Sequence, residues 1–304
     1  MTIAKGIVLA GGTGTRLHPL TLVTSKQLLP VYNKPMIYYP LSVLMLAGIR
    51  QILIVTTPED QNQFKRLLGG GEQWGVQFQY AVQPRPEGLA QAFVIGQAFL
   101  RGEPAALVLG DNLFFGHNLQ EMLLRASRRQ KGATIFAQQV DDPNRYGVIT
   151  FNADGRPIAI EEKPKQPRSN WAVTGLYFYD ARVSDIAAAV KPSQRGELEI
   201  TDVNRAYLEL GDLHAERMGR GFAWLDAGTY DALLDAANLV QVVERRQRLS
   251  IAAVEEIAYR NGWIDAAALR EHARKLGQTP YAAYLTRVAD DETLMRSPAQ
   301  KTTR

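Results

Sequence analysis

The amino-acid sequence predicts an α/β fold, in which a mixed, mainly parallel sheet is covered by helices and carries extra antiparallel strands. Short apolar runs alternate with helical stretches through the first half of the chain. These runs are apolar almost throughout, as strands buried on both faces are. A glycine-rich loop at residues 11–14 follows the first run, at the edge where sheets of this class bind ligands.

The first half of the chain contains strand and helix candidates in alternation. Apolar runs rich in β-branched residues predict strands, and apolar residues at helical spacing predict helices. The expected strands are Lys5–Ala10, Gln51–Thr56, Val76–Val82 and Ala105–Leu109, and the expected helices are Ile37–Ala47, Glu59–Leu68 and Leu89–Leu100. Strands that alternate with helices form βαβ units, so we expect these strands to be parallel.

The middle of the chain has several strand candidates separated by turns, and helices return after it. The turn signals are Asp-Pro-Asn at 142–144 and Asn-Ala-Asp-Gly at 152–155. Expected strands are Ala133–Gln138, Tyr146–Phe151, Pro157–Glu162 and Ala172–Tyr179, and expected helices are Val183–Val190, Thr201–Leu210, Tyr230–Gln247, Val254–Tyr259 and Asp265–Leu276. We expect partly antiparallel strands attached to the parallel sheet, and C-terminal helices packed on the body.

Composition excludes several classes of function. The 304-residue chain has no cysteine, which excludes disulfides, thiolate metal sites and cysteine nucleophiles. The net charge of +4 is modest, and the basic clusters at 128–131 and 244–248 lack interleaved aromatics, so we expect solvated helix faces and no nucleic-acid partner. The longest apolar run, 36–49, contains Pro40 and is too short for a bilayer. With no N-terminal signal peptide, a cytoplasmic location and no membrane partner are expected.

The loop Gly11–Arg16 predicts a polyphosphate site. Its three glycines allow backbone N–H groups to approach an anion, and Arg16 and Lys26 add positive charge. A dinucleotide fingerprint would need a third spaced glycine after Gly14, and a Walker loop would need Gly-Lys-Ser/Thr; both are absent. A plain strand-to-helix turn is the remaining alternative.

Asp111 and Asp226 each follow an apolar run. Either aspartate alone fits a helix cap. Together with a cationic glycine loop, the two favour a shared Mg²⁺ at the same sheet edge as that loop.

Glu162 is predicted to lie on an apolar strand face. It has the same parity as Ile158 and Ile160 in the expected strand, and a carboxylate there needs partners. Lys163 would supply an ion pair, and ligand hydroxyls are the other possibility. Pro164 ends the strand, so both side chains are expected at an edge where a pocket can open.

Several motifs of the chain resemble those of the sugar-1-phosphate nucleotidylyltransferases. They lie at 6–21, 25–30, 34–41, 83–84, 88–92, 109–112, 161–164, 196–202 and 224–228, and the resemblance extends to about Arg260. Ser25 and Gln27 around the lysine match the thymidylyl branch of that family. The resemblance implies a Rossmann-like fold, the nucleotide-diphospho-sugar transferase fold.

The resemblance also implies the reaction. The phosphate of glucose 1-phosphate would attack the α-phosphorus of dTTP in one in-line displacement, giving dTDP-glucose and pyrophosphate, the first step of dTDP-rhamnose synthesis. This reaction needs no protein nucleophile, in agreement with a chain that has no cysteine. Catalysis would then depend on positioning and charge stabilisation.

By resemblance, each substrate and the metal has its own set of residues. The nucleotide would be held by Gly11, Gly14, Thr15, Arg16, Lys26, Gln27, Gln83 and Gly88, with the two glutamines on thymine. Glucose 1-phosphate would be held by Asn112, Tyr146, Gly147, Glu162, Lys163, Val173 and Glu197. Asp111 and Asp226 would bind Mg²⁺, and the catalytic cations would be Arg16, Lys26 and Lys163.

The resemblance further implies a homotetramer with a regulatory nucleotide-sugar site at an interface. Gly116, Gly219, Glu256 and Arg260 match positions near that site, although Glu256 and Arg260 also fit a simple i,i+4 ion pair. We expect a nucleotidyltransferase domain at 1–250, with a nucleotide-binding half at about 1–130 and a sugar-binding half at about 131–230. A helical extension at 251–289 and a flexible tail at 290–304 would follow.

Three alternatives remain open. A nucleotidylyltransferase of the same fold that uses UTP or CTP is the nearest. A glycosyltransferase would usually carry Asp-x-Asp where Asp111-Asn112-Leu113 stands. A non-catalytic sugar-nucleotide sensor would be expected to lose Arg16, Lys26, Asp111 or Asp226, and all four are present.

Overall fold

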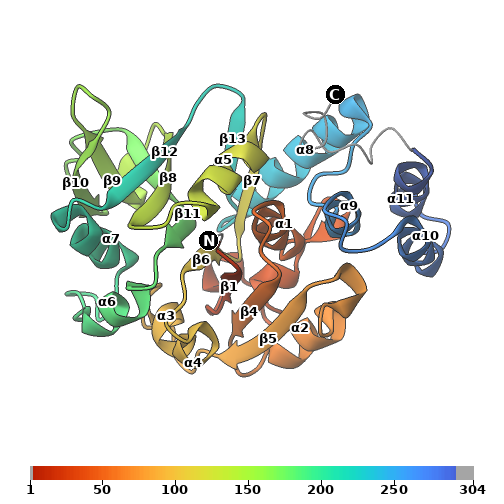
Figure 1. The fold of residues 1–304 in the computed structure, drawn as a ribbon, viewed down its shortest axis with the longest axis horizontal. Coiled ribbons are helices and arrows are strands. Elements are labelled where there is room, and N and C mark those ends of the chain that lie inside the picture. Colours follow the sequence, from red (N-terminus) through yellow and green to blue (C-terminus); the bar gives the residue numbers. More distant parts are fainter. Residues whose placement is uncertain (1–2, 292–304) are drawn as a thin grey trace.

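A computed structural model describes residues 3–291 of the chain and contains a nine-stranded sheet with helices on both faces (Figure 1). The strands are β1 (Lys5–Ala10), β4 (Gln51–Thr56), β5 (Gln77–Val82), β6 (Ala105–Leu109), β8 (Ala133–Gln139), β9 (Gly147–Phe151), β10 (Pro157–Glu162), β11 (Trp171–Tyr179) and β12 (Leu213–Met218). The main path has the order β10-β9-β11-β6-β1-β4-β5, and β8 joins it by pairing with β11 and β12.

The N-terminal part of the sheet is parallel, as predicted. β1 lies between β4 and β6, with Lys5 opposite both Gln51 and Ala105, and β4 pairs with β5 in the same sense. The carboxyl ends of these strands therefore meet at one edge. Beyond β6 the sheet changes direction, because β11 is antiparallel to β6, β8 and β9. Both the α/β class and the antiparallel extension are confirmed.

Alternation along the strands sends successive side chains into two cores. In β1, Val8 and Ala10 belong to one core, while Ile7 and Leu9 belong to the other. The first core also takes residues from α1 (Tyr38–Leu46), α2 (Gln61–Leu68), α5 (Leu119–Ser127) and α9 (Val254–Arg260). The second takes residues from α3 (Gln91–Ile95), α4 (Gln97–Leu100), α6 (Val183–Ala189) and α7 (Ile200–Glu209).

A separate two-stranded ribbon stands beside the main sheet. It pairs β7 (Asn112–Gly116) with β13 (Phe222–Asp226), antiparallel, and packs near α8 (Tyr230–Gln247) and the short pair β2 (Pro30–Val31) and β3 (Lys34–Pro35). The helices α10 (Ala266–Lys275) and α11 (Pro280–Asp290) pack on each other and on α9 at one side of the molecule (Figure 1). The single-turn helices are η1 (Thr15–Leu17), η2 (Lys26–Leu28), η3 (Glu72–Trp74) and η4 (Pro143–Arg145).

Three predictions about local structure need correction. The helix expected at 89–100 is divided at Gly96 into α3 and α4; a Cβ there would lie 3.0 Å from Cδ1 of Ile7, so this position packs closely on the sheet. Ile158 does not share a buried face with Glu162. A register shift between Pro157 and Ala159 inserts one extra residue, which leaves Ile158 56% exposed while Ile160 is buried. The segments α5, α11, β2, β3, β7, β12 and β13 were not predicted as elements.

The ends of the chain limit two further predictions. The tail was expected to begin at 290, but α11 includes Asp290, and residues 292–304 lie outside the described part of the chain. Within 3–291, no helix is both long and apolar enough to cross a membrane.

Candidate active site

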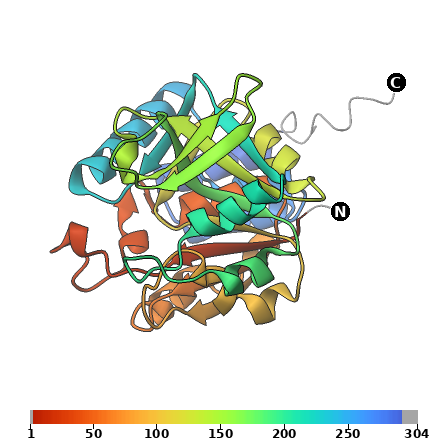
Figure 2. The same cartoon turned by 90° about the vertical axis from the view of Figure 1, so that its left-hand side faces the viewer.

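The loop after β1 forms a small cavity at the carboxyl edge of the parallel strands. Gly14 has a left-handed backbone with φ 61°, and its carbonyl accepts a hydrogen bond from Oγ1 of Thr21 at 2.8 Å. A Cβ at Gly14 would come within 3.1 Å of Thr21, so both the backbone conformation and the limited space favour glycine. The cavity, of about 290 Å³, is lined by Thr13, Gly14, Thr15, Arg16, Lys26, Asp111, Asp226 and Gly228. The chain that follows this loop, coloured red, extends outward at the left of the view in Figure 2.

Lys26 and Asp111 face each other in this cavity. Asp111 comes directly after β6, and Nζ of Lys26, from η2, donates to its Oδ2. Although burial opposes ionisation, the ammonium of Lys26 keeps the pKa of Asp111 below its ordinary value, and Asp111 in turn raises the pKa of Lys26. The pair is therefore ionised. The prediction that Asp111 and the glycine loop share one edge is confirmed.

Asp226 reaches the same cavity by a different route. It ends β13, which pairs with β7 so that Asp226 lies opposite Asn112, and the N–H of Ala227 donates to the carbonyl of Asp111 at 3.1 Å. The expectation that Asp226 lies on the edge of the main sheet is wrong. Asp226 belongs to the separate two-stranded ribbon, and this ribbon brings it to the cavity that Asp111 lines. Burial, followed by repulsion from Asp111, raises the pKa of Asp226 to about 6.

The two aspartates suit a divalent cation that is shared with phosphate oxygens. No hydrogen bond within residues 3–291 reaches the carboxylate of Asp226, whereas Asp111 is paired with Lys26 and Asn112. Among the described residues there is also no group of three or more histidine, aspartate or glutamate side chains arranged for a metal. A site with one or two carboxylates, completed by substrate phosphates and water, is the arrangement that Mg²⁺ commonly uses.

A larger cleft, of about 690 Å³, adjoins this cavity. The two share Arg16, Asp111 and Asp226. The residues of the cleft that the sequence predicted for glucose 1-phosphate are Asn112, Tyr146, Gly147, Glu162, Lys163 and Val173. It is further lined by Leu89, Leu109, Arg145, Gly175, Tyr177, Arg195, Ile200, Thr201, Trp224 and Thr229.

Asn112 is a buried cross-link at the bottom of the cleft. Its Oδ1 accepts from the N–H of Gly175 at 3.0 Å and from Nε1 of Trp224 at 2.6 Å, and its Nδ2 donates to Asp111 at 2.9 Å. One side chain thus links β11, the ribbon and Asp111. The ring of Trp224 also packs on Tyr146, with centroids 5.0 Å apart.

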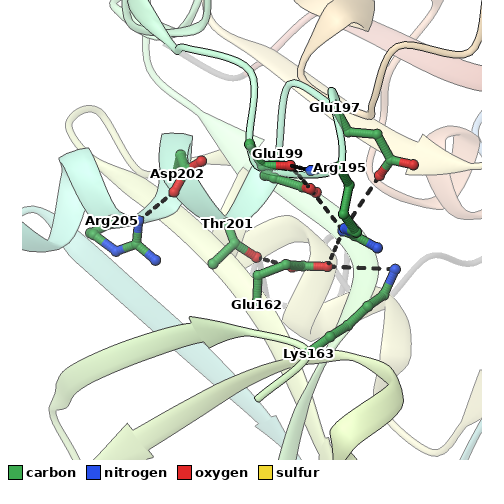
Figure 3. Close-up of polar contacts among 9 residues, drawn as sticks. Glu162, Lys163, Arg195, Glu197, Glu199, Thr201, Asp202 and Arg205 are labelled. Atoms are coloured by element: carbon green, nitrogen blue, oxygen red, sulfur yellow. Dashed lines mark hydrogen bonds and ion pairs between the residues drawn. The ribbon is translucent and has the colours of Figure 1, made fainter. Parts of the chain in front are cut away.

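Glu162 is the centre of a charged network along one wall of the cleft (Figure 3). Its Oε2 accepts from Thr201 at 2.5 Å, and its Oε1 lies 3.2 Å from Arg195 and 3.6 Å from Nζ of Lys163. The predicted pairing with Lys163 is present, but Arg195 and Thr201 are closer. Lys163 has φ 42°, an unusual backbone for a side chain with Cβ, at the point where β10 ends before Pro164.

Arg195 is a cleft residue that the sequence reasoning missed. It also pairs with Glu199 at 2.7 Å and Glu197 at 3.4 Å. Glu197, predicted for the sugar pocket, is not among the residues that line the cleft, although it pairs with Arg195, which does line it. In the sequence, Arg195 lies between Pro192 and two glutamates, and this is the local feature that could have identified it. The feature does not show that Arg195 lies in a cleft, because that depends on its long-range contact with Glu162.

The residues predicted for the base, Gln27 and Gln83, lie outside both cavities and are 3% and 4% exposed. Gln83 follows β5, and its Oε1 lies over Gly11, where a Cβ would be only 2.1 Å away. Gly88 has φ 105°, and a Cβ there would approach the backbone of Leu198 to 2.4 Å. The structure therefore gives Gly11 and Gly88 packing reasons to be glycine.

The residues predicted for a regulatory site occupy two places. Gly116, in β7, lies under the ring of Phe222, and the carbonyl of Gly219 accepts from the N–H of Phe222 at 3.3 Å. Glu256 and Arg260 form an i,i+4 ion pair on α9, with 2.7 Å between Oε1 and Nε. The alternative of a helical ion pair is therefore present in the structure.

Comparisons with known proteins identify the family and the fold of the chain. A family model described as nucleotidyl transferase matches residues 5–242. A glucose-1-phosphate thymidylyltransferase of Xanthomonas campestris pv. campestris is 61% identical over 289 residues, covering 95% of this chain and 98% of that one. A candidate glucose-1-phosphate thymidylyltransferase from Bacillus anthracis, solved with sucrose, is 43% identical with a TM-score of 0.72, covering 77% of this chain and 94% of that one. A UDP-glucose pyrophosphorylase complexed with UDP-glucose is 26% identical with a TM-score of 0.70, covering 79% and 99%.

Proposed function

The chain belongs to the nucleotidyl transferase family, and from this we propose that it transfers the thymidylyl group of dTTP to glucose 1-phosphate, forming dTDP-glucose and pyrophosphate. One observation carries the proposal. A cationic, glycine-lined cavity and a sugar-sized cleft adjoin each other and share Arg16, Asp111 and Asp226. This arrangement suits a triphosphate in the first and a sugar phosphate in the second, with the reacting phosphorus between them.

The reaction is a single displacement. A phosphate oxygen of glucose 1-phosphate forms a bond to the α-phosphorus of dTTP, the bond from that phosphorus to the bridging oxygen breaks, and pyrophosphate leaves. Two anions must approach, so positive charge is needed on both sides. Arg16 and Lys26 would neutralise the triphosphate, while Lys163 and Arg195 would receive the sugar phosphate.

Asp111 and Asp226 would hold Mg²⁺. When bound, this ion would neutralise phosphate charge and fix the orientation of the phosphate oxygens. The carboxylate of Asp226, which has no hydrogen-bond donor among residues 3–291, supports this assignment.

The cleft wall would orient the sugar. Thr201 and Arg195 occupy only part of the acceptor capacity of Glu162, so its carboxylate can also accept hydrogen bonds from sugar hydroxyls. The rings of Tyr146 and Trp224 would exclude water on the opposite side. Val173 and Gly147 add apolar surface and space.

The choice of base can be tested with dUTP, because UTP also carries a 2′-hydroxyl that dTTP lacks. Thymine differs from uracil by one methyl group, which is worth about 1–3 kcal/mol in a pocket. We therefore expect measurable pyrophosphate release with dUTP, with a kcat/KM about 10- to 200-fold below that for dTTP. A complete absence of turnover at saturating dUTP would contradict the argument from the methyl group, and faster turnover with UTP than with dTTP would favour the UTP-using alternative.

The decisive experiment is a pyrophosphate-release assay over a matrix of nucleoside triphosphates and sugar 1-phosphates, with and without Mg²⁺. Turnover should be highest with dTTP and glucose 1-phosphate and should be lost when the metal is chelated. Release of pyrophosphate only with another nucleotide, or with none, would overturn the proposed function.

Further features of the protein are proposed from the family resemblance of its sequence. We propose a homotetramer located in the cytoplasm, a regulatory nucleotide-sugar site near Gly116, Gly219, Glu256 and Arg260, and a place at the start of dTDP-rhamnose synthesis. We also keep the proposed division into 1–250 and 251–289, with nucleotide binding in about 1–130 and sugar binding in about 131–230. Sedimentation analysis with and without dTDP-rhamnose tests the oligomer and the regulatory site together.

A further inference from the structure

The side-chain amide of Gln83 is held by neighbours of fixed polarity. Its Nε2 donates to Oε1 of Gln91 at 2.6 Å, and Nε2 of Gln91 donates to Oε2 of Glu87 at 2.8 Å. The backbone N–H of Glu87 also donates to Oε1 of Gln91 at 3.3 Å. An ionised carboxylate can only accept and a backbone N–H can only donate, so both groups of Glu87 require the same orientation of Gln91.

The orientation of Gln91 determines that of Gln83. Because Oε1 of Gln91 faces it, Gln83 must turn its NH₂ group toward Gln91 and its Oε1 away. That Oε1 lies against Gly11, at the end of β1. Within residues 3–291 it has no hydrogen-bond partner, and it is not completely enclosed by protein. A fixed hydrogen-bond acceptor is therefore left available beside the loop of the triphosphate cavity.

Within residues 3–291, Gln27, the second glutamine at this edge, has no comparable anchor. Its Oε1 accepts from the hydroxyl of Ser25 at 2.6 Å. A hydroxyl group can donate or accept, so the amide of Gln27 can turn over without losing this bond. Of the two glutamines, only Gln83 has a polarity that the protein dictates.

We propose that Glu87 and Gln91 form a relay that compels Gln83 to accept a hydrogen bond from the nucleotide base, and that this relay sets selectivity against cytosine. The identity of the base rests on the proposed function. Thymine and uracil carry an N3–H donor, whereas N3 of cytosine is an acceptor. Opposite the fixed Oε1, cytosine would leave two acceptors in contact and unpaired, which is costly in a desolvated site. Glu87 and Gln91 act as positioning residues, since neither needs to touch the base.

The test is the binding of dTTP, dUTP and dCTP, measured by calorimetry in the presence of Mg²⁺, to the wild type and three variants. Gln91→Leu keeps the volume and removes the anchor, so the amide of Gln83 can turn over. The ratio of the Kd for dCTP to the Kd for dTTP should then fall about 10-fold, the equivalent of roughly one hydrogen bond. Glu87→Gln, at an exposed position that should not disturb folding, replaces a fixed acceptor with a reversible amide and should lower the ratio by a smaller factor.

The double variant Glu87→Gln/Gln91→Glu moves the carboxylate from 87 to 91. Gln83 again meets an obligatory acceptor, so the ratio should return to within about 2-fold of the wild-type value. The ratio of dUTP to dTTP should stay constant in all variants, because both bases carry N3–H.

Equal losses of dTTP and dCTP affinity in Gln91→Leu would overturn the relay and leave Gln91 with a purely structural role. So would a wild-type chain that binds dCTP as tightly as dTTP. Because binding is measured without turnover, failure of the proposed function is recognised separately. A chain that shows the expected ratios but releases no pyrophosphate with glucose 1-phosphate would refute the reaction and support the relay.

Discussion

Two pairs of buried carboxylates in this molecule differ in whether each member has its own hydrogen-bond donors. Glu255 and Glu256, in α9, are both largely buried, and each has its own donors. The hydroxyl of Tyr281 donates to Glu255 at 2.5 Å, whereas Glu256 accepts from Arg260 at 2.7 Å and also from the hydroxyl of Tyr284. The two tyrosine hydroxyls connect α9 to α11.

Asp111 and Asp226, in the candidate active site, do not both have hydrogen-bond donors of their own. Lys26 and Asn112 satisfy Asp111, but no donor among residues 3–291 reaches the carboxylate of Asp226. Repulsion from Asp111 adds to the cost of burial, and the pKa of Asp226 is raised to about 6 as a result. A buried carboxylate with a structural role accepts hydrogen bonds from donors of the protein itself. A carboxylate without such donors, in contrast, is a candidate ligand for a cation.

The largest expected effect is the loss of turnover in variants of the candidate active site. Arg16→Ala or Asp111→Asn should lower kcat by about 10²-fold or more, because Arg16 would neutralise the triphosphate and Asp111 would hold the metal ion that neutralises phosphate charge in the transition state. Pyrophosphate release with dTTP and glucose 1-phosphate measures it, and circular dichroism checks folding. Near-wild-type turnover in both folded variants would refute the assigned roles.

A substitution in the α9 pair should change stability instead. Glu255→Leu removes the acceptor of the Tyr281 hydroxyl, and the free energy of unfolding should fall by about 2 kcal/mol. Turnover per folded molecule should remain unchanged. Glu255→Gln is the matched control, since its amide oxygen keeps the hydrogen bond. Urea denaturation measures stability, and a loss of turnover without a loss of stability would contradict the comparison.

The smallest expected effect is an increase in stability. The carboxyl of Asp226 has a pKa of about 6 in the folded protein and 3.8 when unperturbed. Because the fold favours the protonated form, its contribution to the free energy of unfolding is complete below pH 3.8 and is lost as the pH rises through 6. At pH 7.5, metal-free Asp226→Asn should be about 1–2 kcal/mol more stable than the metal-free wild type, allowing for solvent screening of the shift.

The stability difference for Asp226→Asn should vanish near pH 4. Thermal unfolding in EDTA and then in Mg²⁺ measures it, and only the wild type should gain stability from the metal. A metal-free variant that is less stable than the wild type at pH 7.5 would show that the carboxylate of Asp226 is already satisfied by the protein.

Local sequence patterns predicted most of the elements. β1, β4, β6, β10 and α8 were expected with the bounds that the structure shows, because each is a run whose periodicity or apolar character lies within a few residues. The prediction for Ile158 was wrong because a bulge changes side-chain parity without changing composition.

Contacts between distant segments explain what was not predicted at the site. Asp226 was expected on the main sheet, but the pairing of β13 with β7, across more than a hundred residues, brings it to Asp111. Arg195 was missed because its importance comes from Glu162, which lies 33 residues away. Neither partner is visible from local periodicity or from turn chemistry.

The sequence by itself determined the α/β class, the glycine loop after β1 and the kinds of side chain at the site, because backbone conformation and residue chemistry are local properties. Only the tertiary structure decided that no donor among residues 3–291 reaches the carboxylate of Asp226, that Arg195 lines the cleft beside Glu162, and which way the amide of Gln83 faces. Each of these depends on a hydrogen bond or a charge supplied by another segment, and such partners exist only once the strands and helices have packed.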